Sequence, residues 1–263
     1  MSHSLNTWVN GLSGRMGSTV QKKILESEGH TFTGGSGSEG IYSITSEQYL
    51  SSKEVNEDVF AGTDLIIDFS VPEGNLELLK MLKKHQCRSK AILIASTGLK
   101  REQRDQWKEF AVTNHCSVLF APNTSLGILL TLQSCLAVAQ GVRGKNFDIE
   151  LIESHHKGKI DSPSGTAKFI SEALGNQENL DPVFERRGAR KESEIGVFAL
   201  RGGSVFGEHT IHFMGQSEEI SISHKALSRD LFAEGALVMG RWLNQQEKSS
   251  HYSLLDIKIE NIK

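Results

Sequence analysis

The segment TWVNGLSGRMG, Thr7–Gly17, decides the fold. Its first four residues form a run typical of a short strand, and glycines follow at positions 11, 14 and 17. An amphipathic pattern over Gly14–Ser27 then predicts a helix, with Met16, Val20 and Ile24 on one face. Glycines at this spacing allow a tight turn and let the backbone approach a pyrophosphate at the helix N-terminus. Glycine-rich turns also occur without a ligand, so this loop alone leaves both interpretations open.

The rest of the first half alternates short apolar runs with helical patterns. This alternation predicts an α/β fold with a Rossmann-like, doubly wound parallel sheet and helices on both faces. The expected strands are Thr7–Asn10, His30–Thr33, Leu65–Phe69, Ala91–Ala95 and Val118–Ala121, and the expected helices are Gly14–Ser27, Asn75–Gln86 and Arg101–Asn114.

The second half follows a different pattern. After a helix at Leu126–Gln140, strand-like runs follow one another with a single helix among them, which predicts an α+β domain with a mixed sheet. A last helix, Asp230–Leu243, could return to the first domain. We therefore expect domains at 1–126 with 230–263 and at 127–229. The expected elements of the second domain are strands Phe147–Ser154, Ile195–Leu200, Val205–Phe213 and Glu219–His224 and helix Ser164–Leu174.

The bulk composition excludes several classes of function. The 263 residues carry a net charge of −3, with 38% hydrophobic and 23% charged residues, which is typical of a soluble globular protein. No global positive field would attract nucleic acid or an anionic membrane, and we expect neither partner. The three cysteines contain no CxxC pair, and residues 1–10 lack a secretory signal pattern. A cytoplasmic location fits these features best.

The turn expected after the second strand, Thr33–Ser38, is unusual for a dinucleotide site. An NAD-binding domain normally carries Asp or Glu there to hold the ribose hydroxyls. This chain has Gly37 and Ser38 instead, and no acid before Glu39. Nothing would therefore repel a 2′-phosphate, although no arginine supports one. We expect NADPH, or the use of both NADPH and NADH.

The segment HHKGKIDSPSGTA, His155–Ala167, carries the strongest chemical signal. Imidazoles titrate near neutral pH and pass a proton in either direction, and the Lys159 ammonium can donate a proton or hold a carboxylate. The Pro-Ser-Gly-Thr run predicts a helix start whose N–H groups can bind an anion. The alternative is an ordinary solvated turn with one buried, hydrogen-bonded histidine.

A metal site is a further alternative at the same segment. The ligands would be His155 with His209, His212 and His224. Positions 209 and 212, however, point to opposite faces of a strand, and no acidic partner set is visible. We expect no metal.

These motifs, taken in order, closely resemble the 4-hydroxy-tetrahydrodipicolinate reductase (dihydrodipicolinate reductase) family. The segment ESHHKGKIDSPSGTA at 153–167 is similar to the family motif E-x-H-H-x-x-K-x-D-x-P-S-G-T-A. The resemblance runs nearly end to end, with further matching segments at 14–17, 68–74, 97–98, 121–127, 201–209, 224–229 and 232–236.

The resemblance implies an NAD(P)H-dependent reductase of diaminopimelate and lysine biosynthesis that acts on a small dicarboxylate. It also implies a homotetramer, with a dinucleotide-binding first domain and a substrate-binding and tetramerisation second domain. By motif match, His155 would be the proton donor and acceptor and Lys159 the second proton donor. Substrate carboxylates would contact His156, Gly165 and Thr166. The nucleotide would contact Gly11, Leu12, Ser13, Gly14, Arg15, Met16, Gly37, Ser38, Ala95, Ser96, Thr97, Ala121, Pro122, Asn123 and Thr124.

Some positions depart from the family pattern. Gly37 and Ser38 replace the usual Glu and Arg, Ala95-Ser96 replaces Gly-Thr, and Thr124 stands where an aromatic residue is common. None of these changes touches the proton-transfer residues. Two competing hypotheses are a related Rossmann reductase acting on another small imine and a non-catalytic NADP(H)-binding sensor. The sensor would have lost the proton donors, which this chain keeps.

Overall fold

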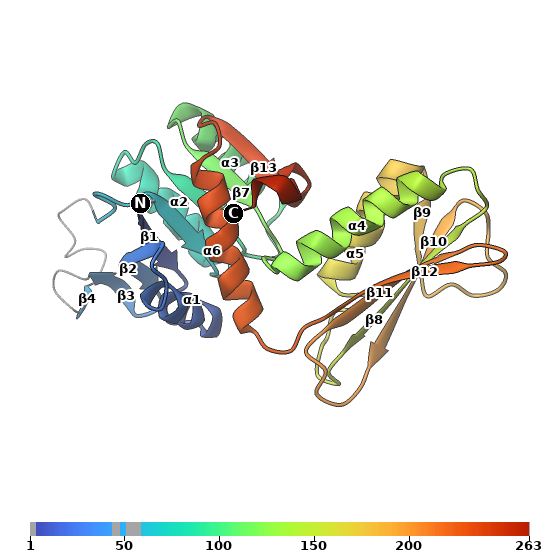
Figure 1. Ribbon diagram of the computed structural model, residues 1–263. Coiled ribbons are helices and arrows are strands. Elements are labelled where there is room, and N and C mark those ends of the chain that lie inside the picture. The colour runs from blue at the N-terminus through green and yellow to red at the C-terminus, as the bar shows by residue number, and fades with distance from the viewer. Residues whose placement is uncertain (1–3, 44–47, 51–58, 263) are drawn as a thin grey trace. The chain divides into compact units, whose positions relative to one another are not determined.

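The chain folds into two compact units, Met1–Leu126 with Asp230–Lys263, and Gly127–Arg229 (Figure 1). The structure is a computed structural model that describes residues 4–43, 48–50 and 59–262. The first domain expected from the sequence also includes residues 1–3, 44–47, 51–58 and 263, which lie outside the described residues.

The first unit is built on an eight-stranded sheet with the strand order β13-β7-β6-β5-β1-β2-β3-β4. The strands from β13 to β2 pair in parallel, which confirms the predicted doubly wound sheet, and the hairpin β3–β4 extends one edge antiparallel. The bounds are β1 Leu5–Asn10, β2 His30–Gly37, β3 Gly40–Ser43, β4 Gln48–Leu50, β5 Leu65–Asp68, β6 Ala91–Ile94, β7 Ser117–Phe120 and β13 Ser250–Ser253.

The second strand is longer than its sequence pattern indicates. The turn expected at residues 34–38 is wrong for positions 34–37, because β2 continues to Gly37 and pairs there with β3. Ser38 does lie in a turn. Glycine has low strand propensity, but here the packing requires it. A Cβ at Gly34 would lie 2.6 Å from the ring of Trp8 on β1. The close approach of the two strands therefore overrides the local preference.

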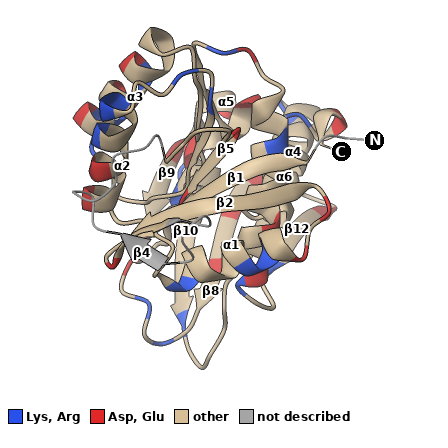
Figure 2. Cartoon of the chain, turned by 90° about the vertical axis from the view of Figure 1, so that its left-hand side faces the viewer, with Lys and Arg blue, Asp and Glu red and all other residues tan. Residues whose placement is uncertain are grey.

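Helices cover both faces of this sheet. Helices α2 and α3 bury Leu78, Leu82, Trp107 and Phe110 against one face, while α1 packs beside α6, which contacts β5 and β6. Strands β1 and β2 carry no charged side chain, whereas α1, α2 and α3 carry several (Figure 2). The bounds are α1 Arg15–Leu25, α2 Pro72–Lys84, α3 Arg101–Thr113 and α6 Asp230–Asn244.

The second unit is a five-stranded mixed sheet with the order β12-β11-β8-β10-β9. The central strand β8 pairs in parallel with β10 and antiparallel with β11, as a mixed α+β sheet requires. Its two helices share a hydrophobic core with one face of the sheet. The bounds are α4 Leu126–Val142, β8 Asp148–His155, α5 Gly165–Glu178, β9 Asp181–Phe184, β10 Glu194–Arg201, β11 Glu208–Met214 and β12 Glu219–Lys225.

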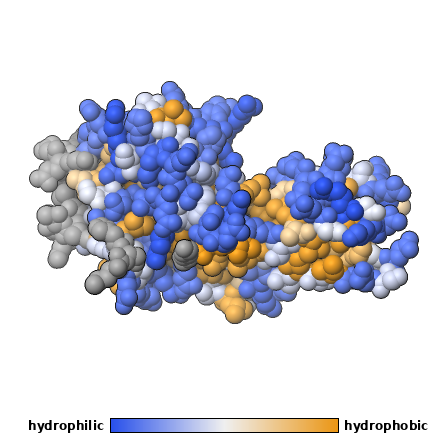
Figure 3. Space-filling view, turned by 45° about the horizontal axis from the view of Figure 1, so that its top comes forward, coloured by the Kyte–Doolittle hydropathy of each residue, from blue (hydrophilic) through white to orange (hydrophobic). Residues whose placement is uncertain are grey.

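Alternation along β8 separates the two faces of this second sheet. Ile149 and Leu151 face the helices and are buried, whereas Ile152 points the other way and is 38% exposed. Leu200 on β10 shares that second face and is 58% exposed. Figure 3 also shows hydrophobic side chains over a wide part of the second unit's surface. Among the described helices, none combines the length and the apolar character needed to cross a bilayer.

A buried histidine makes the stability of the first unit depend on pH. His30 is buried on β2, and its Nδ1 lies 3.0 Å from the Thr7 hydroxyl. Burial, with the nearby positive charge of Arg241, lowers the pKa of His30 to about 4. The unfolded chain takes up this proton near pH 6.5. His30 therefore lowers the free energy of unfolding as the pH falls from above 6.5 towards 4.

We expect this residue to cost about 2 kcal/mol of unfolding free energy between pH 8 and pH 5. The measurement is urea denaturation at both pH values for the wild type and for His30→Asn, which can keep the bond to Thr7. The wild type should lose about 2 kcal/mol more than the variant. Equal losses in the two proteins would contradict the assignment of this proton.

Candidate active site

A cavity of about 520 Å3 opens at the carboxyl ends of the central strands of the first unit. Strand β1 lies between β2 and β5, so the chain first continues to one side of β1 and later returns to its other side. Ligands of open α/β sheets bind at such a switch point. The cavity is lined by Asn10, Gly11, Ser13, Gly14, Ser36, Gly37, Ser38, Gly40, Ile41, Phe69, Ser70, Val71, Gly74, Glu77, Leu78 and Met81.

The loop that carries glycines at positions 11, 14 and 17, here called the glycine loop, shapes the floor of this cavity. Gly11 has a φ of +84°, and a Cβ there would lie 2.9 Å from the backbone of Phe69. Gly17 packs so closely on the Gly11 carbonyl that no side chain fits between them. Gly14 is the N-cap of α1 and adds no side chain over the helix end. The first turn of α1 therefore offers its N–H groups and positive dipole to an anion.

Ser13 and Ser38 join the glycine loop to the end of β2. The two hydroxyl oxygens lie 3.1 Å apart, and the Ser38 N–H donates to the Ser13 Oγ at 3.2 Å. A Cβ at Gly37 would lie 2.5 Å from that same Oγ, so the serine occupies the space that a larger residue at 37 needs. Among the described residues that line the cavity, the only charged side chain is Glu77, on α2.

A buried carboxylate lies beneath the cavity, and the sequence pattern did not predict a structural role for it. Asp68, at the end of β5, is fully buried. It accepts hydrogen bonds from Asn10 Nδ2 at 2.8 Å, from Asn75 Nδ2 at 2.7 Å and from the Ser96 hydroxyl at 2.6 Å. Ser70 donates to it through both its N–H and its hydroxyl. One charge thus holds together the strand ends that surround the cavity.

The structure brings some of the expected nucleotide residues into this lining and leaves others outside it. Gly11, Ser13, Gly14, Gly37 and Ser38 line the cavity. The hydroxyl of Ser96 is committed to Asp68, and that of Thr124 donates to the Phe232 carbonyl at 2.7 Å. The expected residues outside the lining are Leu12, Arg15, Met16, Ala95, Ser96, Thr97, Ala121, Pro122, Asn123 and Thr124.

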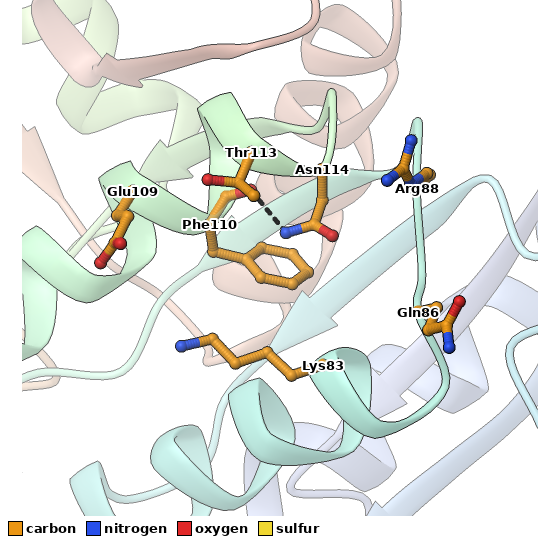
Figure 4. A pocket seen from close by; sticks show the side chains of 7 residues that line it. All are labelled: Lys83, Gln86, Arg88, Glu109, Phe110, Thr113 and Asn114. Atoms are coloured by element: carbon orange, nitrogen blue, oxygen red, sulfur yellow. Dashed lines mark hydrogen bonds between the residues drawn. The ribbon is translucent and has the colours of Figure 1, made fainter.

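A second hollow in this unit, of about 400 Å3, lies between the ends of α2 and α3 (Figure 4). This second hollow lies at the C-termini of the two helices, which carry partial negative charge. It is therefore at the amino ends of the parallel strands, whereas the glycine loop is at their carboxyl ends. None of the expected site residues lines it. Its lining consists of Lys83, Gln86, Arg88, Glu109, Phe110, Thr113 and Asn114.

In the second unit, strand register gathers the polar side chains. Glu153 on β8 lies opposite His209 on β11, which in turn lies opposite His224 on β12. His155, two residues after Glu153, points to the same face and lies opposite Arg201 on β10. The sheet therefore assembles residues that are far apart in the sequence.

Glu153 is the centre of this cluster and is fully buried. His155 donates to its carboxylate through Nδ1, Arg201 Nη2 donates at 2.8 Å, and the Ser164 N–H donates at 3.0 Å. Burial alone would raise the pKa of this carboxyl, but these hydrogen bonds outweigh burial and lower the pKa of Glu153 to about 2. The group is therefore ionised at neutral pH.

His209 forms one wall of the cluster. Its ring meets that of His155 edge-on, with centroids 5.3 Å apart, and its Nε2 lies 3.2 Å from the Ser164 hydroxyl. Burial, with the neighbouring His155 adding to the effect, lowers the pKa of His209 to about 3. This ring is neutral at physiological pH.

The same residues bear on the metal alternative. Ligand atoms of Glu153, His155 and His209 lie within 4.8 Å of one another. However, Arg201 already supplies a positive charge to the carboxylate, and His212 lies apart from this group, bonded to Glu219. A metal ion would have to compete with the guanidinium, so we still expect none.

The loop after β8 places a cation next to a helix N-terminus. The Lys159 ammonium lies 2.7 Å from the carboxylate of Asp161. The backbone N–H of Gly165, at the start of α5, also bonds to that carboxylate and, with Lys159, lowers the pKa of Asp161 against the effect of burial. Ser164 caps the helix by accepting the Ala167 N–H at 3.2 Å. Of the other expected substrate residues, His156 and Thr166 are half-buried on either side of this loop.

Two models of one protein family match the two halves of the chain. The family model "Dihydrodipicolinate reductase, N-terminus" matches residues 5–124, and "Dihydrodipicolinate reductase, C-terminus" matches residues 127–257. This chain belongs to the dihydrodipicolinate reductase family. The family consists of NAD(P)H-dependent oxidoreductases, so the reductase uses a nicotinamide cofactor.

Curated relatives cover nearly the whole reductase. A 4-hydroxy-tetrahydrodipicolinate reductase of Syntrophotalea carbinolica is 38% identical over 89% of this chain and 92% of its own length. One from Aquifex aeolicus is 36% identical over 97% of this chain and 98% of its own.

Solved structures agree with the fold. A dipicolinate-bound dihydrodipicolinate reductase from Paenisporosarcina sp. TG-14 superposes with a TM-score of 0.75, covering 97% of this chain and 100% of that one, at 21% identity. A diaminopimelate dehydrogenase of C. glutamicum gives 0.60 at 12% identity, covering 99% and 96%. The C-terminal family model extends past residue 229 into α6 and β13, which pack with the first unit.

Gly207 tests how closely the reductase depends on the position of the His155 ring. A Cβ at Gly207 would lie 2.9 Å from His155 Nε2, so Gly207→Ala should displace the imidazole. We expect reductase activity to fall about 10- to 100-fold, with about 1–3 kcal/mol of overpacking cost in unfolding free energy. The matched control is Gly202→Ala in the same loop, where nothing lies within 4 Å of the new Cβ. Equal activity in the two variants would contradict this dependence.

Proposed function

We propose that the chain catalyses the NAD(P)H-dependent reduction of 4-hydroxy-tetrahydrodipicolinate, via dihydrodipicolinate, to tetrahydrodipicolinate in diaminopimelate and lysine biosynthesis. The observation that carries the proposal is the pairing of the buried Glu153 with His155 beside the cation of Lys159 and the N-terminus of α5. Proton donor and carboxylate-binding groups thus lie on one short segment. Family membership supplies the substrate class.

The first unit would hold the nucleotide. The glycine loop and the start of α1 suit the pyrophosphate, and Gly37 and Ser38 suit the adenosine ribose at the end of β2. The bound nicotinamide supplies a hydride. The protein residues have to orient the cofactor and exclude water, which the buried Asp68 network supports by fixing the loop ends.

The second unit would bind the dicarboxylate and supply the proton. Asp161 already places a carboxylate between the Lys159 ammonium and the Gly165 N–H, so this position accommodates the charge and shape of a substrate carboxylate. His156 and Thr166 would complete the binding site. His155 would protonate the carbon framework as hydride arrives, and Lys159 would serve as the second proton donor.

Cofactor choice follows from the end of β2. No carboxylate from β2 lines the described cavity, and no arginine does either. A 2′-phosphate would therefore meet hydroxyls and N–H groups without a repelling charge. We propose that the enzyme accepts both NADPH and NADH and favours NADPH.

The assembly would be a cytoplasmic homotetramer joined through the second sheet. Ile152 and Leu200 lie exposed on the face that the helices leave uncovered, and exposed apolar surface on a sheet is typical of an interface. The three cysteines are buried free thiols, as expected in a reducing compartment.

The test of the reaction follows the oxidation of NADPH and of NADH in parallel, with substrate generated in situ from pyruvate and aspartate semialdehyde. We expect rapid oxidation of both cofactors, faster with NADPH. Lys159→Ala should lower turnover about 100-fold with nucleotide affinity unchanged, because the described residues that line the nucleotide cavity all belong to the first unit. Folded protein that binds nucleotide but oxidises neither cofactor would refute the proposed reaction.

Gly165→Ala tests the carboxylate position separately from the fold. Nothing lies within 4 Å of a Cβ at Gly165, which is exposed, so the free enzyme should tolerate the change. A substrate carboxylate that approaches the open side of Gly165, where the Asp161 carboxylate does not lie, would meet the new methyl group. We expect KM for the dicarboxylate to rise about tenfold, with KM for NADPH unchanged. Gly141→Ala, on α4 and equally unhindered, is the control. An unchanged dicarboxylate KM would remove Gly165 from the binding site.

A further inference from the structure

The two oxygens of Glu153 have different partners. Oε1 accepts two hydrogen bonds, from the Ser164 N–H at 3.0 Å and from Arg201 Nη2 at 2.8 Å. Oε2 is directed at Nδ1 of His155. Glu153 is the first residue of the family motif, but none of the roles inferred from that motif belongs to it. It is nevertheless the most deeply buried acid in the cluster, with an exposed fraction of zero.

The ionised carboxylate determines where the neutral imidazole keeps its proton. An ionised carboxylate accepts hydrogen bonds and donates none, and the low pKa of Glu153, about 2, keeps it ionised. The partner nitrogen, Nδ1 of His155, must therefore carry the hydrogen. A neutral imidazole has one N–H only, so Nε2 is left as the atom that can take up and release a proton.

We propose that Glu153 is a positioning residue that holds His155 in its Nδ1–H tautomer and so reserves Nε2 for proton exchange with the substrate. The role deepens the proposed function and rests on it for its catalytic meaning. Carboxylates that orient a histidine in this way set both its tautomer and its ring plane.

The surroundings of the ring agree with this role. Gly207 keeps space beside Nε2, since a Cβ there would lie 2.9 Å away. The ring of His209 stands edge-on to His155 and is neutral, so it offers no competing charge. Arg201 also donates to the Asp161 carbonyl at 2.6 Å. The same guanidinium thus ties Glu153 to the loop that carries Lys159.

The unequal partners of the two oxygens make Glu153→Gln informative. The single amide oxygen of Gln should take the Oε1 position, because two donors, Ser164 N–H and Arg201, converge there. The amide NH2 then faces Nδ1 of His155, which must become an acceptor. The expected result is a reversal of the tautomer, with the proton on Nε2, in a side chain of nearly unchanged shape.

The experiment is 15N NMR of histidine-labelled full-length protein, at a pH where the imidazole is neutral, with His155 assigned by difference from His155→Asn. We expect the Nδ1–H tautomer in the wild type and in Glu153→Asp, and the Nε2–H tautomer in Glu153→Gln. In steady-state assays, Glu153→Gln should lower kcat about 100-fold with KM for NADPH unchanged. Glu153→Asp should restore part of kcat.

Glu150→Gln is the matched control for loss of a buried charge. Glu150 lies on the same strand, points to the opposite face, is nearly as buried, and pairs with Arg186 and Arg190. The Glu150→Gln substitution should destabilise the protein and leave both the tautomer of His155 and kcat per folded enzyme unchanged.

Each outcome decides a separate point. A Nε2–H tautomer in the wild type, an unchanged tautomer in Glu153→Gln, or a kcat unaffected by that change would overturn the role of Glu153. The tautomer is read without substrate. A reversal in Glu153→Gln with no reduction by the wild type would therefore leave the positional role standing and reject only the proposed reaction.

Discussion

The architecture of the second unit depends on one buried negative charge. The Glu153 carboxylate has no access to solvent, so protein donors must replace its hydration. Those donors come from three elements: His155 from β8, Ser164 from the cap of α5, and Arg201 from the end of β10. Removing one partner of such a buried pair costs about 3–5 kcal/mol. The charge therefore holds the strand ends and the helix start in one arrangement, and the groups proposed for catalysis belong to it.

The first unit uses the same physical device at its own strand ends. Asp68 is fully buried and collects donors from β1, from the turn after β5, from α2 and from the end of β6. Because every strand in that region is parallel, all these ends meet at one edge of the sheet. The resulting rigidity surrounds the glycine loop, whose own conformation needs Gly11 and Gly17. Binding surfaces are formed by loops, and buried carboxylates keep those loops in place.

Sequence patterns predicted the elements that depend on local signals. Strand β6 and the first three residues of β5 are short, fully buried apolar runs, and α1 and α2 show clear amphipathic spacing. The elements that were missed depend on pairing instead. Strand β9 contains Pro182, and β13 reads SHYS, so neither has a strand signature. Each forms because the edge of a neighbouring strand, β10 or β7, offers backbone groups for pairing. The strand expected at Val205–Phe213 also begins later, at Glu208.

The sequence by itself determined the glycine loop, the βα alternation, and the proximity of His155, Lys159 and Gly165, because these features depend on neighbours within a few residues. Only the tertiary structure decided the partners of Glu153. Arg201 and His209 lie about fifty residues away in sequence, and strand register alone brings them to the carboxylate. The tertiary structure also turned the Ser96 hydroxyl towards Asp68. A buried charge selects its donors by position in space, and local sequence patterns do not encode that position.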